Sequence, residues 1–198
     1  MNSSIVNLIH RLLLAATGLL FFFPEANARS LFFEDFERLP LGPNVDEAVA
    51  GENVWTNLPP EKWSIENDIP GLDDEAVGVK EWEGWAFAKV AWWVEAAEDQ
   101  RRSEFTNATG TAAIVDPDEW DDKGSPSGLG NLNSTLRLPA ISLAGVAANS
   151  AILSFDSSWR PDAGQRARID VSYDSGEPVV LAEWSSDAAS PNYKADDS

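Results

Sequence analysis

The chain has no cysteine, and its single histidine is His10. Without cysteine there are no disulfides to stabilise the fold. Catalysis by Ser-His-Asp or Cys-His systems needs an imidazole to move the proton, and zinc sites are built mainly from Cys and His. The remaining chemistry is that of carboxylates, of metal ions held by oxygen and of aromatic binding surfaces, so we expect a protein that is not an enzyme.

Long hydrophobic runs are also scarce. Residues 12–23 form an apolar run of about 12 residues, whereas a membrane-spanning helix needs about 20. Arg11 precedes this run, and Pro24 and the small-x-small pattern Ala26-Asn27-Ala28 follow it, as in secretory signals. We therefore expect residues 1–28 to be a signal peptide that is cleaved before Arg29. The mature protein is then secreted or held at the cell surface, with no stable membrane span.

Basic residues are few, since 14 Lys and Arg stand against 33 Asp and Glu, a net charge of −19. Such a surface repels phosphate backbones and anionic lipids, so we expect no nucleic-acid partner and no binding to anionic membranes. The acidity suits calcium binding or a saline medium, and solubility alone explains it equally well.

Short strand patterns separated by polar turns dominate the rest of the chain. In 167–173 the residues Ala167, Ile169, Val171 and Tyr173 alternate with polar ones, as in a half-buried antiparallel strand. The second half of 82–98 has the pattern of a short helix. We predict an all-β fold, an antiparallel β-sandwich of the jelly-roll type with long loops and at most a short helix, over 29–184. The expected strands are 30–37, 63–65, 110–116, 135–143, 150–159, 167–173 and 179–184.

The order of these motifs resembles a known group of modules. A Phe-Glu-Asp-Phe-Glu stretch at 33–37 is followed by Leu-Pro-Ala-Ile-Ser-Leu at 138–143, Ala-Ile-Leu-Ser-Phe-Asp at 151–156, a hairpin pattern at 169–176 and Trp184. This order resembles the cleaved-adhesin, choice-of-anchor J and MAM-like jelly-roll modules.

The resemblance implies a secreted, concanavalin-like sandwich with a binding or structural role, often attached to other domains and often holding a structural calcium near its first strand. The closing strand of that group is lacking here, so 185–198 is expected to be a polar tail and a truncated continuation of the module. A similar layout precedes calcineurin-like phosphoesterase domains. The alternative is therefore the N-terminal segment of a secreted hydrolase whose catalytic domain is missing.

Acidic residues supply the candidate metal ligands, because calcium takes six to eight oxygen ligands. They lie on the expected first strand and in the acidic loop 116–122, at the end of the expected strand 110–116. A solvated acidic loop is the alternative interpretation. The candidates are Glu34, Glu37, Asp116, Asp118, Asp121 and Asp122.

Nine tryptophans are present, and four of them lie close together in the sequence. An exposed group of such rings would form a stacking platform for sugars, and the alternative is that they form the hydrophobic core. The candidates are Trp82, Trp85, Trp92 and Trp93. We therefore predict adhesion or glycan binding, with a polysaccharide or a cell-surface glycan as partner. The abundant carboxylates leave a carboxylate-based glycosidase as a second enzymatic alternative.

Overall fold

The computed structural model describes residues 29–68, 78–96, 98–123, 132–174 and 176–197. The chain divides into two units, residues 1–30 and residues 31–198, and all the elements below belong to the second. The expected signal peptide, 1–28, lies outside the described residues. Within the described ranges, no helix is both long and apolar enough to cross a membrane.

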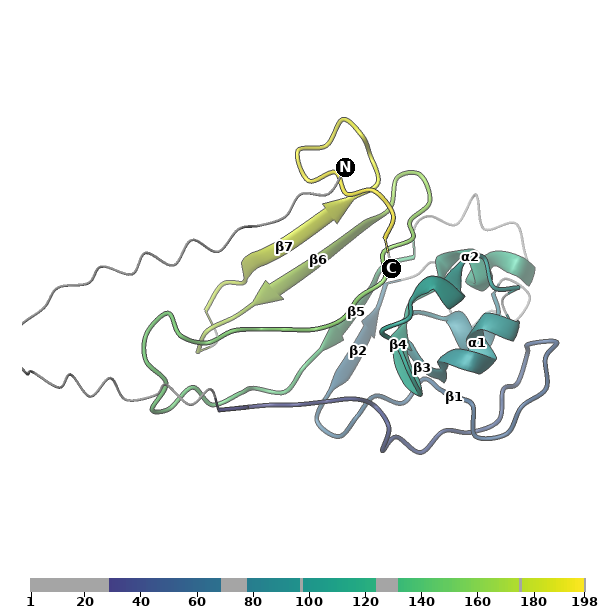
Figure 1. The fold of residues 1–198 in the computed structure, drawn as a ribbon, viewed down its shortest axis with the longest axis horizontal. Coiled ribbons are helices and arrows are strands. Elements are labelled where there is room, and N and C mark those ends of the chain that lie inside the picture. Colours follow the sequence, from purple (N-terminus) through teal and green to yellow (C-terminus); the bar gives the residue numbers. More distant parts are fainter. Residues whose placement is uncertain (1–28, 69–77, 97, 124–131, 175, 198) are drawn as a thin grey trace, which may run out of the picture. The chain divides into compact units, whose positions relative to one another are not determined.

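The centre of the fold is a three-stranded antiparallel sheet in which β3 (Ala86–Lys89) lies between β1 (Trp55–Thr56) and β4 (Thr111–Ile114) (Figure 1). Three of the four β3 residues are fully buried. A strand that is covered on both faces reads as a continuous apolar run, and Ala-Phe-Ala in β3 is such a run. The expected short helix is confirmed, because α1 (Val90–Ala96) begins directly after β3.

Tryptophan rings make up half of the buried core beside this sheet. The rings of Trp82 and Trp92 are stacked, with centroids 5.9 Å apart and planes at 21°. The indoles of Trp55, Trp82 and Trp92 donate their N–H groups, as in the 2.9 Å bond from Trp55 Nε1 to the carbonyl of Glu81. Among the described residues, Nε1 of Trp120 has no hydrogen-bond partner. The core cluster comprises Trp55, Val79, Trp82, Ala86, Ala88, Trp92, Ile114 and Trp120.

Two further sheets have two strands each. They pair β2 (Ser64–Asn67) with β5 (Ser134–Arg137), and β6 (Arg166–Val171) with β7 (Val179–Ser185), all antiparallel. The predictions of strands near 63–65, 110–116, 135–143, 167–173 and 179–184 are confirmed in part or in full. Helical turns are short: η1 (Lys80–Trp82), η2 (Arg102–Glu104), α2 (Pro117–Trp120) and η3 (Asp121–Lys123). The described fold is thus mostly antiparallel sheet with a few short helices.

The strand expected at 30–37 is wrong. The chain turns there, because the Glu34 carboxylate accepts the backbone N–H of Phe36 at 2.7 Å and the N–H of Leu39 bonds to the carbonyl of Phe36. Phe36 has a φ of 60°, outside the extended region. Side-chain acceptors so close in sequence compete with a strand ladder for the backbone donors.

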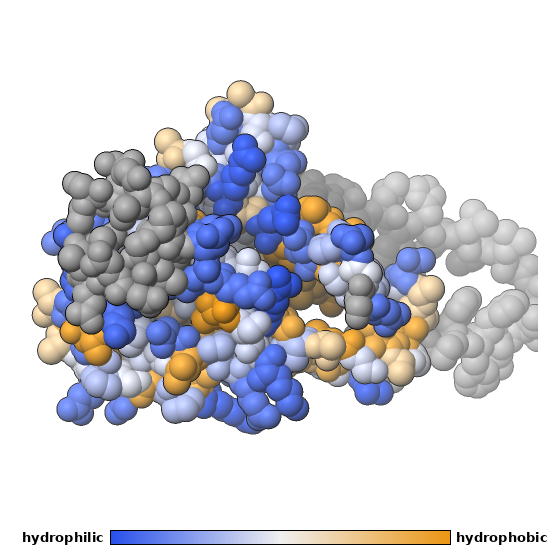
Figure 2. All heavy atoms as spheres, turned by 180° about the vertical axis from the view of Figure 1, so that it is seen from behind, coloured by the Kyte–Doolittle hydropathy of each residue, from blue (hydrophilic) through white to orange (hydrophobic). Residues whose placement is uncertain are grey.

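The strand expected at 150–159 is also absent, and only Trp159 forms a bridge, to Asp197. The segment finds no neighbouring strand among the described residues, and without one its apolar side chains stay at the surface. Ile152 is 90% exposed, and Leu153 and Phe155 are more than half exposed. Figure 2 shows hydrophobic side chains in orange at the surface among hydrophilic ones.

Candidate functional site

A buried arginine lies between two buried carboxylates next to the central sheet. Arg102 comes from η2, Asp116 follows β4, and Glu119 lies in α2. Nη2 of Arg102 is 2.9 Å from Oδ2 of Asp116 and 2.7 Å from Oε1 of Glu119. The guanidinium lies 5.3 Å from the ring centroid of Trp93, whose Nε1 donates to Asp116 Oδ2 at 3.1 Å. We call these four residues the Arg102 cluster.

The local sequence explains why both carboxylates reach the same guanidinium. Asp116 is the N-cap of α2, where its Oδ1 accepts the backbone N–H of Glu119 at 3.5 Å. Pro117 follows at the first helical position, where the missing N–H costs nothing. A side chain at the N-cap and one three residues later lie on the same side of the first turn. The Asp-Pro-Asp-Glu sequence therefore presents two acids to one arginine.

The electrostatic balance of the Arg102 cluster is unequal, because one cation faces two carboxylates. Burial raises the pKa of Glu119 to about 7. The hydrogen bond and charge of Arg102 act in the opposite direction, and the charges of Asp116 and Asp122 raise the pKa further. One carboxyl of the cluster thus takes up a proton near neutral pH, which lowers the repulsion between the two acids.

A carboxyl that titrates near pH 7 is the kind of group that general acid–base catalysis uses. Glu119, however, is 6% exposed, and its Oε1 accepts bonds from both Arg102 and Gln100, the latter at 3.0 Å. The carboxylate therefore forms its hydrogen bonds with other side chains of the protein. The arrangement therefore fixes α2 and η2 to the central sheet rather than presenting an acid to a substrate.

We expect the protein to unfold at a lower temperature at pH 8 than at pH 5.5. The pKa of Glu119 is about 7 in the folded chain and near 4.5 when unfolded. The folded state therefore binds more protons between these values, and the free energy of unfolding falls as the pH rises through this window. Thermal melts followed by circular dichroism at several pH values measure the change.

Glu119→Gln is the matched variant, since it keeps an acceptor for Arg102 and removes the titration. It should flatten the pH dependence between pH 5 and 8. Below pH 4.5 the sign reverses, because ion pairing and hydrogen bonding lower the pKa values of Asp46 and Glu37. A melting temperature that rises from pH 5.5 to pH 8 in the unmodified protein would contradict the assignment.

A second pair of acids borders the core near Trp82. Glu81 is fully buried, and its Oε1 accepts the backbone N–H groups of Val45 and Asp46. Among the described residues, its Oε2 has no hydrogen-bond partner. Glu47 accepts the indole N–H of Trp82. Burial raises the pKa of Glu47, which the negative charges of Glu81 and two aspartates raise further.

The structure does not bring the six predicted metal ligands together. Glu37 bonds to Lys89 at 3.2 Å and to the N–H of Thr111, at the start of β4. Asp116 lies beyond the other end of β4, and its carboxylate is paired with Arg102.

The remaining four candidates lie in two separate parts of the fold. Glu34 bonds to a backbone N–H in its own turn, and Asp118, Asp121 and Asp122 lie on α2 and η3. Burial and the charges of neighbouring aspartates raise the pKa of Asp121. In the part of the chain that the structure describes, no three His, Cys, Asp or Glu residues form a group suited to a metal ion.

The four predicted glycan-binding tryptophans do not form one surface. Trp82 and Trp92 are buried, with exposed fractions of 0% and 6%, and stack on each other. Neither ring is open to a sugar, so for these two the core interpretation is the correct one. Trp85 and Trp93 are half-buried. Trp93 packs on Arg102, whereas Trp85 donates its Nε1 to the carbonyl of Ser134 at 3.3 Å.

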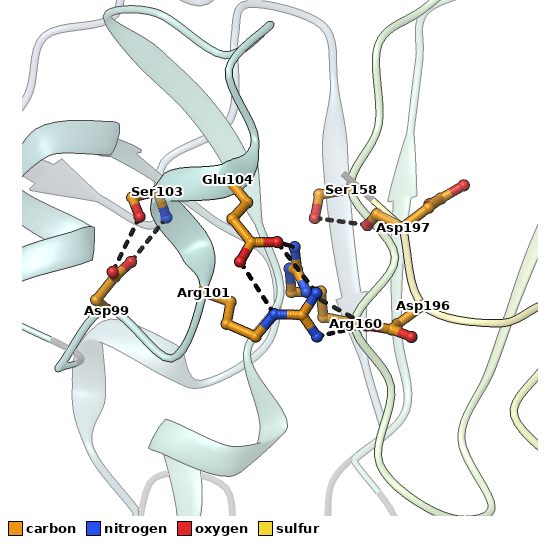
Figure 3. A network of polar contacts seen from close by, with 8 residues as sticks. All are labelled: Asp99, Arg101, Ser103, Glu104, Ser158, Arg160, Asp196 and Asp197. Carbon is orange, nitrogen blue, oxygen red and sulfur yellow. Dashed lines mark hydrogen bonds and ion pairs between the residues drawn. The ribbon is translucent and has the colours of Figure 1, made fainter.

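A network of ion pairs joins η2 to the C-terminal residues (Figure 3). Arg101 bonds to Glu104 and to Asp196, at 3.1 and 2.8 Å. Arg160 reaches the same two acids, at 2.9 and 3.4 Å. Each such pair contributes little in water, but a closed set of four restrains the segments together. The expected polar tail is thus anchored as far as Asp197, which also bridges to Trp159.

Sequence reasoning missed Arg102, Glu119 and Glu47. For Glu119 a signal was present, because Asp116-Pro117 followed by Glu is a helix-start pattern that places two acids on one side. For Arg102, nothing in the sequence around it indicates that a basic residue is buried. Its position depends on packing against Trp93 and on two acids that lie more than ten residues further along.

Comparison of this chain with protein-family models, with curated proteins and with solved structures finds no match. The resemblance to cleaved-adhesin and MAM-like modules therefore stays a prediction.

Proposed function

We propose that this chain is an exported, non-catalytic β-sandwich module that works in adhesion or glycan binding, within a larger surface or secreted protein. The observation that supports this proposal is the number of large apolar side chains at the surface from β5 onward. Soluble domains rarely expose so many together unless a partner covers them. They include Leu138, Ile141, Leu143, Ile152, Leu153, Phe155, Tyr173, Val179, Val180 and Leu181.

The sandwich arrangement belongs to this proposal. Residues 167, 169 and 171 of β6 are half-buried and alternate with exposed ones, as in a sheet with one covered face. A second sheet packed on this face would complete a sandwich with the apolar side chains of 138–155 in its core.

The carboxylates described above favour binding over catalysis. Glycosidases need two acids that face a sugar with different protonation states. The acid with the most strongly raised pKa, Glu119, is turned toward Arg102 and Gln100. No described observation favours the phosphoesterase alternative.

Of the predicted sugar-binding rings, Trp85 is the one that can still face a ligand. Its ring is half-buried and lies at the end of the segment that leads into β3, next to Ser134. A half-exposed indole provides the flat apolar face on which a pyranose ring stacks.

The test is a binding assay against a panel of insoluble and arrayed polysaccharides, with the release of reducing sugars measured in parallel. The proposal expects retention on at least one glycan, no hydrolysis, and loss of retention in Trp85→Ala. Trp63→Ala is the matched control, since Trp63 is also half-buried but packs on Phe36. Repeating the assay after EDTA treatment, with and without calcium, tests the predicted structural calcium. Sugar release would establish the glycosidase alternative, and absence of binding across the panel would overturn the glycan proposal.

A further inference from the structure

The β6–β7 hairpin has an unpaired edge. It is a two-stranded sheet (Figure 1), and a sheet of this size gains stability from further strands. In the described part of the chain, the backbone of Arg166–Val171 bonds to β7 and to no other segment. The outer edge of β6 therefore presents a row of unpaired N–H and C=O groups, which is a template for another strand.

The outer edge of β7 is less suited to accept a strand. Its register with β6 shifts between Ile169 and Asp170, which leaves Leu181 without a partner, and such bulges twist an edge away from pairing. At its end, Ser185 already bonds to Asn192 and Lys194, at 2.9 and 3.0 Å. The regular, unoccupied edge of the hairpin is thus that of β6.

The sequence of β6 is complementary to itself in one antiparallel register. If Ile169 faces Ile169 of the partner subunit, Arg168 faces Asp170 of the partner subunit, and the same pair occurs again across the two-fold axis. On the opposite face of the sheet, Ala167 faces Val171 of the partner subunit, so the side chains that come into contact there are apolar. Opposite charges directly across a strand pair stabilise it, and the apolar face becomes continuous.

We propose that two copies of this chain pair edge to edge through β6, antiparallel and with Ile169 on the two-fold axis, to form a four-stranded sheet. A symmetric dimer needs a self-complementary patch, and this register supplies one. Arg168 and Asp170 already lie 2.8 Å apart within one strand, on the same face, with side chains 58% and 29% exposed. Each can therefore turn to the other copy at little cost.

The net charge of −19 does not prevent this pairing. At physiological ionic strength, exposed charges more than about 8 Å apart are largely screened. β6 itself carries two arginines and one aspartate, so its edge is locally basic rather than acidic.

Reversing the charge of Arg168 or of Asp170 tests the proposal, and mixing the two variants should restore the pairing. In sedimentation velocity at physiological salt, the unmodified protein should be a dimer, whereas Arg168→Asp and Asp170→Arg should each be monomeric because like charges then face each other. An equal mixture of the two variants should form a heterodimer. Arg137→Asp is the matched control, since Arg137 is an equally exposed arginine on β5, and it should remain dimeric. A monomeric unmodified protein, or a mixture that stays monomeric, would overturn the proposal.

A second measurement does not depend on the folding of the charge variants. The chain contains no cysteine, so Ile169→Cys introduces a single thiol. Two cysteines that face each other across an antiparallel pair lie within reach of a disulfide. Mild oxidation should give a covalent dimer of this variant in high yield, whereas Val180→Cys on β7 should stay uncrosslinked. Equal crosslinking of the two variants would reject the proposed register.

Discussion

Arg102→Met will lower the free energy of unfolding by about 3–5 kcal/mol at pH 8, because two buried carboxylates lose the cation that they share. Asp116 and Glu119 are each less than 10% exposed, and both bond to the Arg102 guanidinium. Methionine keeps most of the apolar side-chain volume, so the loss measures charge rather than packing. Urea unfolding followed by tryptophan fluorescence measures it.

The loss should be smaller at pH 5.5, where the Glu119 carboxyl, whose pKa burial raises to about 7, is protonated. The combined variant Arg102→Met, Asp116→Asn, Glu119→Gln is the control. Replacing all the charges of a buried group costs far less than removing one partner, so this variant should recover most of the stability. If the single Arg102→Met variant is as stable as the unmodified protein at pH 8, the two carboxylates are stabilised by water and do not need the charge of Arg102.

Trp82→Ala will lower the free energy of unfolding by about 3–5 kcal/mol, the usual cost of removing a buried aromatic ring. The ring is fully buried, stacks on Trp92 and donates its Nε1 to Glu47. The variant therefore leaves a cavity and an acid without its donor. Differential scanning calorimetry should show a melting temperature lower by many degrees.

Trp85→Ala is the matched control for this prediction, since Trp85 is half-buried and belongs to the same sequence motif. We expect a much smaller loss of stability from it. The comparison also separates the two interpretations of these tryptophans. A Trp82→Ala variant with unchanged stability but weaker glycan binding would restore Trp82 to a binding surface.

The Arg102 cluster and the β6 edge have different consequences. The cluster makes the stability of the central sheet depend on pH, whereas the edge makes the assembly state depend on salt and on two side chains. Neither effect needs a metal ion or a catalytic group.

The sequence by itself determined the elements whose signal is local. The alternation of Ala167, Ile169 and Val171 predicted β6, and the turn residues after it predicted the return of the chain through β7. The helical pattern in the second half of 82–98 predicted α1. Local periodicity and turn chemistry specify such elements because neighbouring residues suffice to form them.

Only the tertiary structure decided which polar and aromatic residues belong together. Composition could not distinguish a tryptophan platform from a core. The burial of Trp82 and Trp92 depends on residues that are distant in the sequence, such as Val49, whose carbonyl accepts the Trp92 indole N–H. Spacing suggested that Asp116 belongs to a group of acids that hold a cation, whereas the charge that neutralises it is the side chain of Arg102. The partner of a buried charge is fixed by long-range packing, which leaves no mark in the local sequence.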